Sequence, residues 1–256
     1  MIRRVCIVVL FCSFGILSKS LDTPVNDWYD NGEGFFVGGQ QNAAIEQFPH
    51  VVSLRTTSNL RFCGGFIVNN RWIVSAAHCI MGRTPANTWI FIGAFEVSAG
   101  GTNVFTSAIN IHPNFAGTTM ANDISCLQTQ ITMIWSAQVQ PLILGDQFIG
   151  GGVQATVAGW GAGNFLQWFI VKTITNDYCR ARHIMASQFI HDNNICTLTQ
   201  ADLGMCALNS GSALVIGNTA VGVVSWGVPC VDDTHSSPDI FSRVSSHRTW
   251  LVSHTG

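Results

Sequence analysis

The sequence predicts an all-β protein that ends in a helix, and three observations support this fold class. Short runs rich in β-branched and aromatic residues alternate with Gly, Asn and Pro at regular spacing, which is typical of antiparallel sandwiches or barrels. Helical periodicity is clear only near the C-terminus, where Val244, Trp250 and Leu251 share roughly one face. With 47% apolar and only 10% charged residues, the chain can bury a sizeable core and is not intrinsically disordered.

The first twenty residues are expected to form a signal peptide. Arg3 and Arg4 precede an apolar run from Val5 to Leu17, and small residues follow at 18–20. The alternative is a membrane anchor, but the run is shorter than the roughly 20 residues that cross a bilayer. We therefore expect residues 1–20 to be removed and the protein to be secreted into the extracellular space.

Residues 21–35 are expected to form a propeptide, because this segment is polar and turn-rich and contains four acids and no Lys or Arg. The body of the protein is then 36–256. Its expected strands are His50–Arg55, Phe66–Val68, Trp72–Ser75, Trp89–Ile92, Val104–Ile111, Gln154–Ala158 and Ala220–Trp226. The closing helix is expected to begin at an N-cap formed by Ser245 or Ser246.

The cysteines favour disulfides over a metal site. Cys6 and Cys12 lie in the expected signal peptide, which leaves seven of the nine cysteines in the secreted chain. An oxidising compartment would pair them, and an odd number leaves at least one thiol free or paired with another molecule. Because no CxxC pair occurs and the histidines lack ligand spacing around the cysteines, we expect no metal and no cofactor.

Three separated segments contain the residue types of nucleophilic catalysis. His78 lies in Ser-Ala-Ala-His-Cys, Asp123 lies in Asn-Asp-Ile, and Ser210 precedes Gly211. In such a set the serine attacks, the histidine accepts its proton, and the aspartate fixes the imidazole tautomer. Taken singly, each residue is explained as well by ordinary solvation or hydrogen bonding.

Together these segments resemble the trypsin/chymotrypsin family of serine proteases. The Ser-Ala-Ala-His-Cys string is the most specific match, and the others are 37–39, 158–161, 224–227, 241–244 and 250–251. The resemblance covers 36–256 and implies two six-stranded antiparallel barrels, approximately 36–140 and 141–256, with the active site between them. It implies that His78 is the general base and acid, Asp123 its orienting partner and Ser210 the nucleophile.

The resemblance also implies roles for the cysteines and a substrate pocket. Three disulfides are expected: Cys63–Cys79, Cys179–Cys196 and Cys206–Cys230. Cys126 is then expected to be a buried, inert thiol, and the alternative is a regulatory thiol. The pocket would be lined by Gly204, Met205, Ser225, Trp226, Gly227 and Asp239. Gly204 at its base and Asp239 in its wall resemble the broad-specificity arthropod chymotrypsins and collagenolytic proteases. Such a pocket is expected to take a large apolar side chain, with a carboxylate available to a basic one. The alternative is that Asp239 lies in an exposed loop after a slip of one residue.

The sequence departs from the family pattern around the nucleophile. Leu208 replaces a glycine of the family pattern. The backbone N–H of that glycine and the N–H of Ser210 form the oxyanion hole. A side chain at this position resists left-handed backbone torsions. Asn209 replaces the aspartate that binds the new N-terminal ammonium after activation. That N-terminus would be Phe36, released by cleavage at Phe35–Phe36, where the family usually has a basic residue before the cut.

Two functions remain open at this point. The first is a secreted chymotrypsin-like serine endopeptidase, made as a zymogen and with reduced activity. The alternative is a catalytically inactive homologue that binds or regulates other proteins. We expect protein or peptide substrates and protease inhibitors as partners, and a monomer. The formal charge of −2 argues against nucleic acid, and no further segment suggests a membrane.

Overall fold

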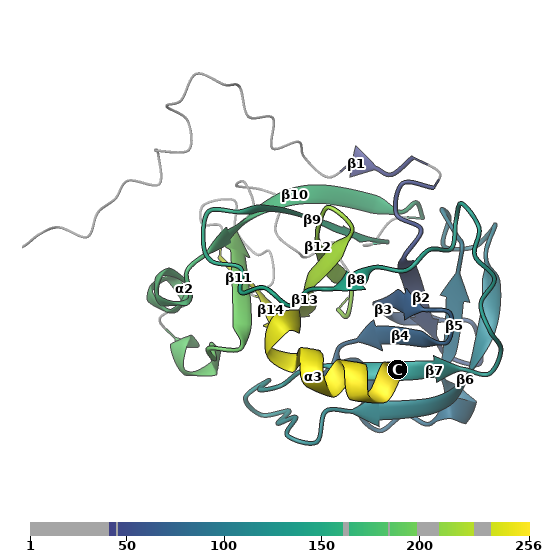
Figure 1. Ribbon diagram of the computed structural model, residues 1–256, viewed down its shortest axis with the longest axis horizontal. Helices are drawn as coiled ribbons and strands as arrows, with labels where there is room; N and C mark the ends of the chain where they lie inside the picture. The colour runs from purple at the N-terminus through teal and green to yellow at the C-terminus, as the bar shows by residue number, and fades with distance from the viewer. Residues whose placement is uncertain (1–40, 45, 161–163, 184, 199–209, 228–236) are drawn as a thin grey trace, which may run out of the picture. The chain divides into compact units, whose positions relative to one another are not determined.

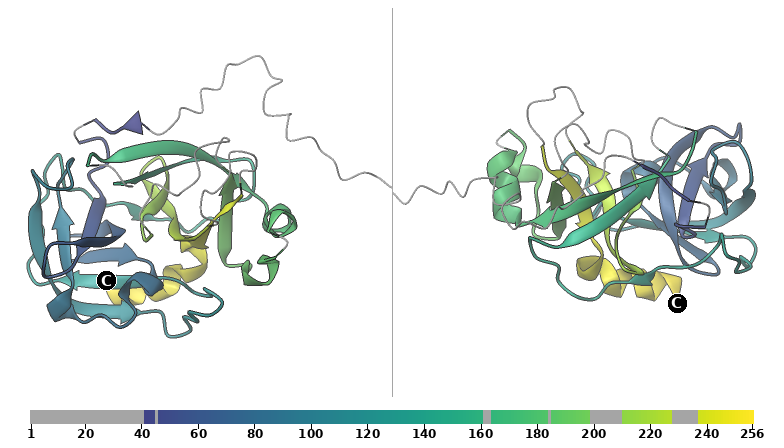
Figure 2. Two further views of the ribbon diagram at one scale, coloured as in Figure 1. Left: turned by 180° about the vertical axis from the view of Figure 1, so that it is seen from behind. Right: turned by 90° about the horizontal axis from the view of Figure 1, so that it is seen from above.

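A computed structural model describes residues 41–44, 46–160, 164–183, 185–198, 210–227 and 237–256. All described residues belong to one compact unit, Val37–Gly256. Within this unit, two groups of strands lie side by side, blue to teal and green to yellow in the ribbon views (Figure 1, Figure 2).

The first group is a closed antiparallel barrel. Its strands are β2 (Val51–Arg55), β3 (Arg61–Asn69), β4 (Trp72–Ser75), β5 (Trp89–Ile92), β6 (Thr102–Ile111) and β7 (Ser125–Thr129). They are ordered β2-β3-β4-β7-β6-β5, and β5 pairs with β2 to close the ring. Buried aliphatic and aromatic side chains from these strands, among them Val52, Leu54 and Phe66, fill the interior.

The second group is also a ring of six antiparallel strands. Its members are β9 (Gln154–Gly159), β10 (Gln167–Ile174), β11 (Asn194–Leu198), β12 (Ala213–Ile216), β13 (Thr219–Trp226) and β14 (Asp239–Arg243). The order is β9-β10-β11-β14-β13-β12, and β12 returns to β9. Two short strands join this sheet: β1 (Gln41–Asn42) pairs with β10, and β8 (Ile143–Leu144) runs parallel to β13. The expected pair of six-stranded barrels is therefore confirmed.

The closing helix α3 (Val244–Thr255) is present, and it buries Val244, His247 and Leu251. Its expected start at Ser245 or Ser246 is wrong, because the residue at the N-cap position is Arg243. Arg243 is the last residue of β14, and its buried guanidinium donates to the carbonyl of Asn194, so packing against β11 sets where the helix begins. No helix among the described residues is long and apolar enough to cross a membrane.

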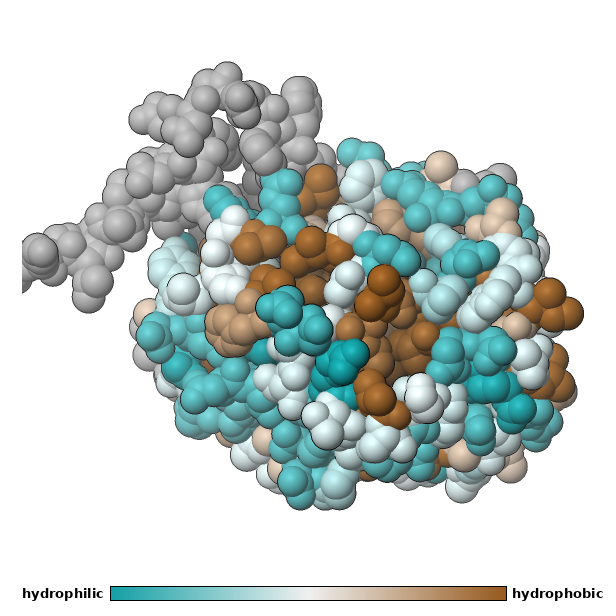
Figure 3. All heavy atoms as spheres, in the orientation of Figure 1, coloured by the Kyte–Doolittle hydropathy of each residue, from teal (hydrophilic) through white to brown (hydrophobic). Residues whose placement is uncertain are grey.

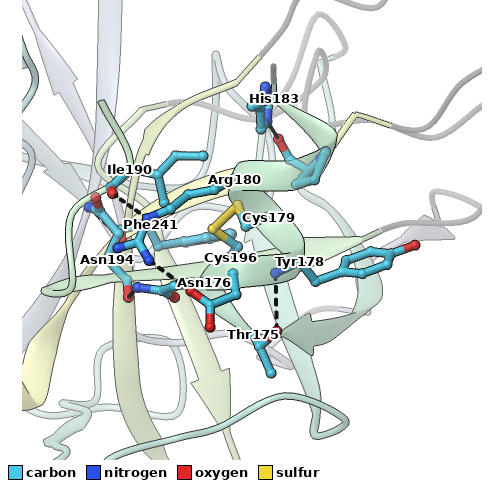
Figure 4. Close-up of a disulfide and its surroundings, with 12 residues drawn as sticks. Thr175, Asn176, Tyr178, Cys179, Arg180, His183, Ile190, Asn194, Cys196 and Phe241 are labelled. Carbon is cyan, nitrogen blue, oxygen red and sulfur yellow. Dashed lines mark hydrogen bonds and ion pairs between the residues drawn. A yellow bond between two sulfur atoms is a disulfide. The ribbon is translucent and has the colours of Figure 1, made fainter. Parts of the chain in front are cut away.

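A helix within the second barrel was missed by the sequence analysis. Helix α2 (Asn176–Arg182) begins at Thr175, whose hydroxyl accepts a hydrogen bond from the N–H of Tyr178 (3.2 Å), as Figure 4 shows. The Cys179–Cys196 disulfide ties it to β11. The other helical turns in the described part of the chain are α1 (Ala77–Ile80), η2 (Pro85–Asn87) and η3 (Ser187–Phe189).

Exposed apolar side chains are present on the face shown in Figure 3, where apolar atoms gather in the middle, over β8. Ile143 of β8 and Val252 of α3 are both exposed. Single exposed apolar residues are normal on soluble proteins, so they assign no function by themselves.

Candidate active site

The structure brings His78 and Asp123 into direct contact. His78 lies in the short helix α1 directly after β4, and Asp123 lies two residues before β7, which pairs with β4. The Nδ1 atom of His78 is 2.7 Å from Oδ2 of Asp123, and the backbone N–H of His78 donates to Oδ1 at 2.8 Å. One carboxylate therefore fixes both the backbone and the ring of the histidine.

Asp123 is fully buried, and its remaining hydrogen bonds come from the second barrel. The hydroxyl of Ser225 in β13 donates to Oδ2 at 2.6 Å, and the hydroxyl of Ser242 in β14 donates to the backbone carbonyl at 2.8 Å. A buried carboxylate is costly unless hydrogen bonds replace water, and here the Ser225 hydroxyl and the ring and backbone N–H of His78 supply them. The arrangement holds His78 with Nδ1–H toward the acid, which leaves Nε2 to accept a proton.

Ser210 lies where the two barrels meet. Its carbonyl accepts from the N–H of Gly64 in β3 (2.8 Å), and the N–H of Gly211 donates to the carbonyl of Val224 in β13 (2.9 Å). Gly211 has a φ of +90°, and a Cβ there would overlap the hydroxyl of Ser75 and the carbonyl of Gly64. Only glycine fits this position, so the residue after the serine is fixed by packing.

The predicted Cys63–Cys79 disulfide is present beside both residues. The Sγ atom of Cys79 is 3.6 Å from Nε2 of His78 and 3.6 Å from the carbonyl oxygen of Ser210. His78 and Ser210 thus approach the same sulfur from different barrels. The side chain of His78 is 25% exposed, so a substrate can reach it.

The described part of the expected pocket lies on β13 and β14. Asp239 begins β14 and is 3% exposed, so the alternative of an exposed loop is wrong. A Cβ atom added to Gly227, the residue that follows the end of β13, would lie 2.9 Å from Oδ1 of Asp239. The carboxylate therefore packs against Gly227. The side chain of Ser225 is directed to Asp123, so any contact it makes with substrate would be through its backbone.

Several expected site residues lie outside the described residues. They are Gly204 and Met205 of the pocket, Leu208 of the oxyanion hole, Phe36 and Asn209 of the activation switch, and the Cys206–Cys230 disulfide.

One pocket neighbour was missed by the sequence analysis. His183, at the C-terminal end of α2, is buried, and its Nε2 atom is 2.7 Å from the carbonyl oxygen of Pro238. Its ring lies 5.5 Å from that of Trp226. His183 therefore contacts Pro238 and Trp226 beside the expected pocket. These residues are far apart in the sequence, so no local motif indicates the contacts.

Cys126 is free and fully buried in β7. Burial raises the pKa of its thiol to about 12, and a hydrogen bond from Asn110 opposes that change in part. A thiol with so high a pKa is neutral at physiological pH and a poor nucleophile. This agrees with the expected inert thiol.

Comparison with known proteins identifies the family of the chain. A sequence model of the trypsin family matches residues 36–251. Trypsin theta of Drosophila erecta is 29% identical over 86% of this chain and 86% of its own length, and a trypsin of the beetle Phaedon cochleariae is 31% identical over 85% and 87%. The chain belongs to the trypsin family of serine proteases.

Solved structures show the same fold. Human heparin-binding protein superposes with a TM-score of 0.73 at 25% identity, covering 86% of this chain and 96% of its own. Neuropsin, a serine protease expressed in the limbic system of mouse brain, superposes with a TM-score of 0.75 at 20% identity, covering 85% and 99%. Membership of a protease family implies protein substrates.

Proposed function

We propose that the protein is a secreted serine endopeptidase that hydrolyses peptide bonds with His78, Asp123 and Ser210. The observation that carries the proposal is the buried Asp123 carboxylate, which binds both the ring and the backbone N–H of His78 and accepts a third hydrogen bond from Ser225. A binding scaffold has no physical need for this arrangement. It is what a general base beside a serine nucleophile requires.

In the proposed reaction, Nε2 of His78 takes the proton of the Ser210 hydroxyl as its oxygen attacks the carbonyl carbon of the substrate. Asp123 stabilises the imidazolium that forms, and the histidine then gives the proton to the leaving amine. Water repeats the sequence and releases the acyl half, which restores Ser210. Backbone N–H groups of Leu208 and Ser210 are the proposed oxyanion donors.

Reduced activity is part of the proposal and rests on the sequence of the nucleophile loop. If Leu208 cannot supply its N–H in the required direction, loss of one oxyanion donor lowers turnover about 10²–10³-fold. Asn209 offers no negative charge to the ammonium of Phe36, and a buried ammonium without a counter-ion costs several kcal/mol. We therefore propose a zymogen, with signal peptide 1–20 and propeptide 21–35, whose cleavage at Phe35–Phe36 activates it only weakly.

The alternative function is a non-catalytic homologue that binds a protein, and the Leu208 and Asn209 replacements favour it. One structural relative, heparin-binding protein, is named for binding rather than for proteolysis. The two functions differ in what the Ser210 hydroxyl does. An inactive homologue keeps its full affinity for a partner when Ser210 is replaced by Ala, and it has no hydrolytic activity to lose.

The experiment is peptide hydrolysis before and after activation. Residues 21–256 are cut with chymotrypsin, the new N-terminus is verified by mass, and the chymotrypsin is removed. Hydrolysis of peptides with a large apolar residue before the scissile bond is then measured. We expect slow turnover by the cut protein and none by Ser210→Ala treated identically. Equal rates for both would contradict the proposal.

A further inference from the structure

The candidate site has two sides, because Ser210 is hydrogen-bonded to one barrel and Gly211 to the other. Gly64 of β3 holds Ser210 from one side, and Val224 of β13 holds Gly211 from the other. The strand β13 ends at Trp226, and the Asp239 carboxylate lies against the next residue, Gly227. If the acyl half of a substrate occupies that side, the leaving half extends over β3.

An aromatic side chain and a cation meet on the β3 side. Phe62 precedes Cys63 in β3, and Arg83 follows helix α1, which carries His78 and Cys79. The Cys63–Cys79 disulfide joins the two segments, and the N–H of Arg83 donates to the carbonyl of Ile80 at 2.9 Å. The guanidinium carbon of Arg83 lies 3.3 Å from the centre of the Phe62 ring. We call this pair the Arg83–Phe62 shelf.

Among the described residues, no acid forms an ion pair with Arg83. The sequence between Glu46 and Glu96 contains four arginines and no Asp or Glu. Arg83 is partly buried, and the burial lowers the pKa of its guanidinium, which nevertheless stays protonated. The shelf is therefore a fixed positive charge.

Stacking on Phe62 also determines from which direction a ligand can reach the guanidinium of Arg83. The ring covers one face of the guanidinium, whereas the N–H donors point outward in its plane. A carboxylate can bind edge-on to such donors, and charge-assisted bonds of this kind are the stronger hydrogen bonds in proteins. The Phe62 ring next to it can pack against the methylene groups of a glutamate side chain.

We propose that the Arg83–Phe62 shelf selects protein substrates with an acidic side chain in the segment that leaves with the new amine. The inference rests on the proposed function, because it assigns the two sides of Ser210 to the two halves of a substrate. It predicts that the protein prefers different residues in the two halves of a substrate. A large apolar or basic residue is preferred near Asp239, and Glu or Asp is preferred near Arg83.

The test uses peptides with one acyl half and different leaving halves. Glu, Gln or Lys is placed at each of the first three positions after the scissile bond, and kcat/KM is measured with the cut protein. We expect Glu to exceed Gln by about three- to tenfold at one position, as for a partly exposed Arg–carboxylate pair, and Lys to fall below Gln. The preference should weaken in 0.5 M salt, a concentration of about three times the physiological ionic strength.

Two variants show whether Arg83 is responsible. Arg83→Gln should remove the preference for Glu while leaving hydrolysis of the Gln peptide within about twofold, because that peptide has no charge to pair. Arg71→Gln is the matched control, since it removes one arginine from the turn between β3 and β4, where Nε of Arg71 donates to the carbonyl of Thr129. It should keep the preference.

The outcomes separate this inference from the proposed function. Hydrolysis at equal rates for Glu, Gln and Lys, or an unchanged preference in Arg83→Gln, overturns the shelf but leaves the protease intact. If no peptide is hydrolysed, the proposed function fails, and equilibrium binding of the same peptides is measured by fluorescence anisotropy. A Glu preference in binding that is lost in Arg83→Gln then supports the shelf, and binding without one overturns it.

Discussion

The two halves of the candidate site differ in how closely they follow the family pattern. The half from the first barrel retains the Ser-Ala-Ala-His-Cys string, and its His78–Asp123 pair has each of the hydrogen bonds that orient a general base. In the half from the second barrel, Ser210 and Gly211 are anchored to both barrels, but the residues before them are Leu208 and Asn209. The residues that would activate the nucleophile therefore follow the family pattern, whereas the residues expected to stabilise the oxyanion and to bind the new N-terminus do not.

The largest effect is expected in the half that follows the pattern. Asp123→Asn would remove the charge that stabilises the imidazolium and would favour the wrong tautomer of His78, so kcat should fall about 10⁴-fold. Hydrolysis by the cut protein measures this. Asp177→Asn, on the surface of α2, is the control and should change kcat less than twofold. A fall of similar size in both variants would show that neither result reports on His78.

The altered half is tested by restoring the family residues. The double variant Leu208→Gly, Asn209→Asp should raise kcat by about 10²–10³-fold if an oxyanion donor and the ammonium partner are what the chain lacks. Leu208→Ala keeps a side chain at the same position and should give no comparable gain. If the double variant is no faster than the natural sequence, the cause of slow turnover lies outside this loop.

A smaller effect is expected where the second barrel supports the first. Ser225→Ala removes the hydroxyl that donates to Oδ2 of Asp123 and should lower kcat about tenfold. This is the low end of the effect of losing a hydrogen bond to a charged group. Ser242→Ala is a close control because its hydroxyl donates to the backbone carbonyl of Asp123 instead. Its effect on kcat should be smaller, and the reverse order would contradict the assignment of Ser225.

A last prediction concerns the free energy of unfolding of the first barrel and not the rate of hydrolysis. Burial lowers the pKa of His50 from 6.5 to about 4. Between these values the unfolded chain binds a proton that the folded protein does not, so stability is complete above pH 6.5 and falls as the pH drops toward 4. The loss is up to about 3 kcal/mol.

Urea unfolding of wild type and His50→Phe at pH 7 and pH 4.5 measures this contribution. The variant should lose less stability than the wild type between the two pH values, whatever its stability at pH 7. An equal loss in both proteins would show that other groups cause the acid sensitivity.

Much of the fold could be predicted because local sequence patterns indicate it. The strands at Trp72–Ser75 and Trp89–Ile92 have the bounds expected from their apolar runs. Helix α2 was missed because seven residues are too few for a periodic pattern, although Thr175 at its start and Arg182 in its last turn were readable signals. The start of α3 was misplaced because the packing of Arg243, and not a serine cap, determines it.

The site was predictable where it depends on motifs and not where it depends on packing. His78, Asp123 and Ser210 stand in recognisable strings, and so does the disulfide beside His78. The bond from Ser225 to Asp123 joins residues 102 positions apart. The stacking of Arg83 on Phe62 likewise requires a three-dimensional arrangement, so no sequence pattern indicated it.

Labelling with a fluorophosphonate, which reacts only with an activated serine, shows directly whether Ser210 is a working nucleophile. Residues 21–256 are cut at Phe35–Phe36, verified by mass, and treated with the probe beside uncut protein and Ser210→Ala. We expect slow but stoichiometric modification of Ser210 in the cut protein and none in the variant. A correctly cut and folded protein that takes up no label would contradict it, and would leave the His78–Asp123 pair as part of a binding protein.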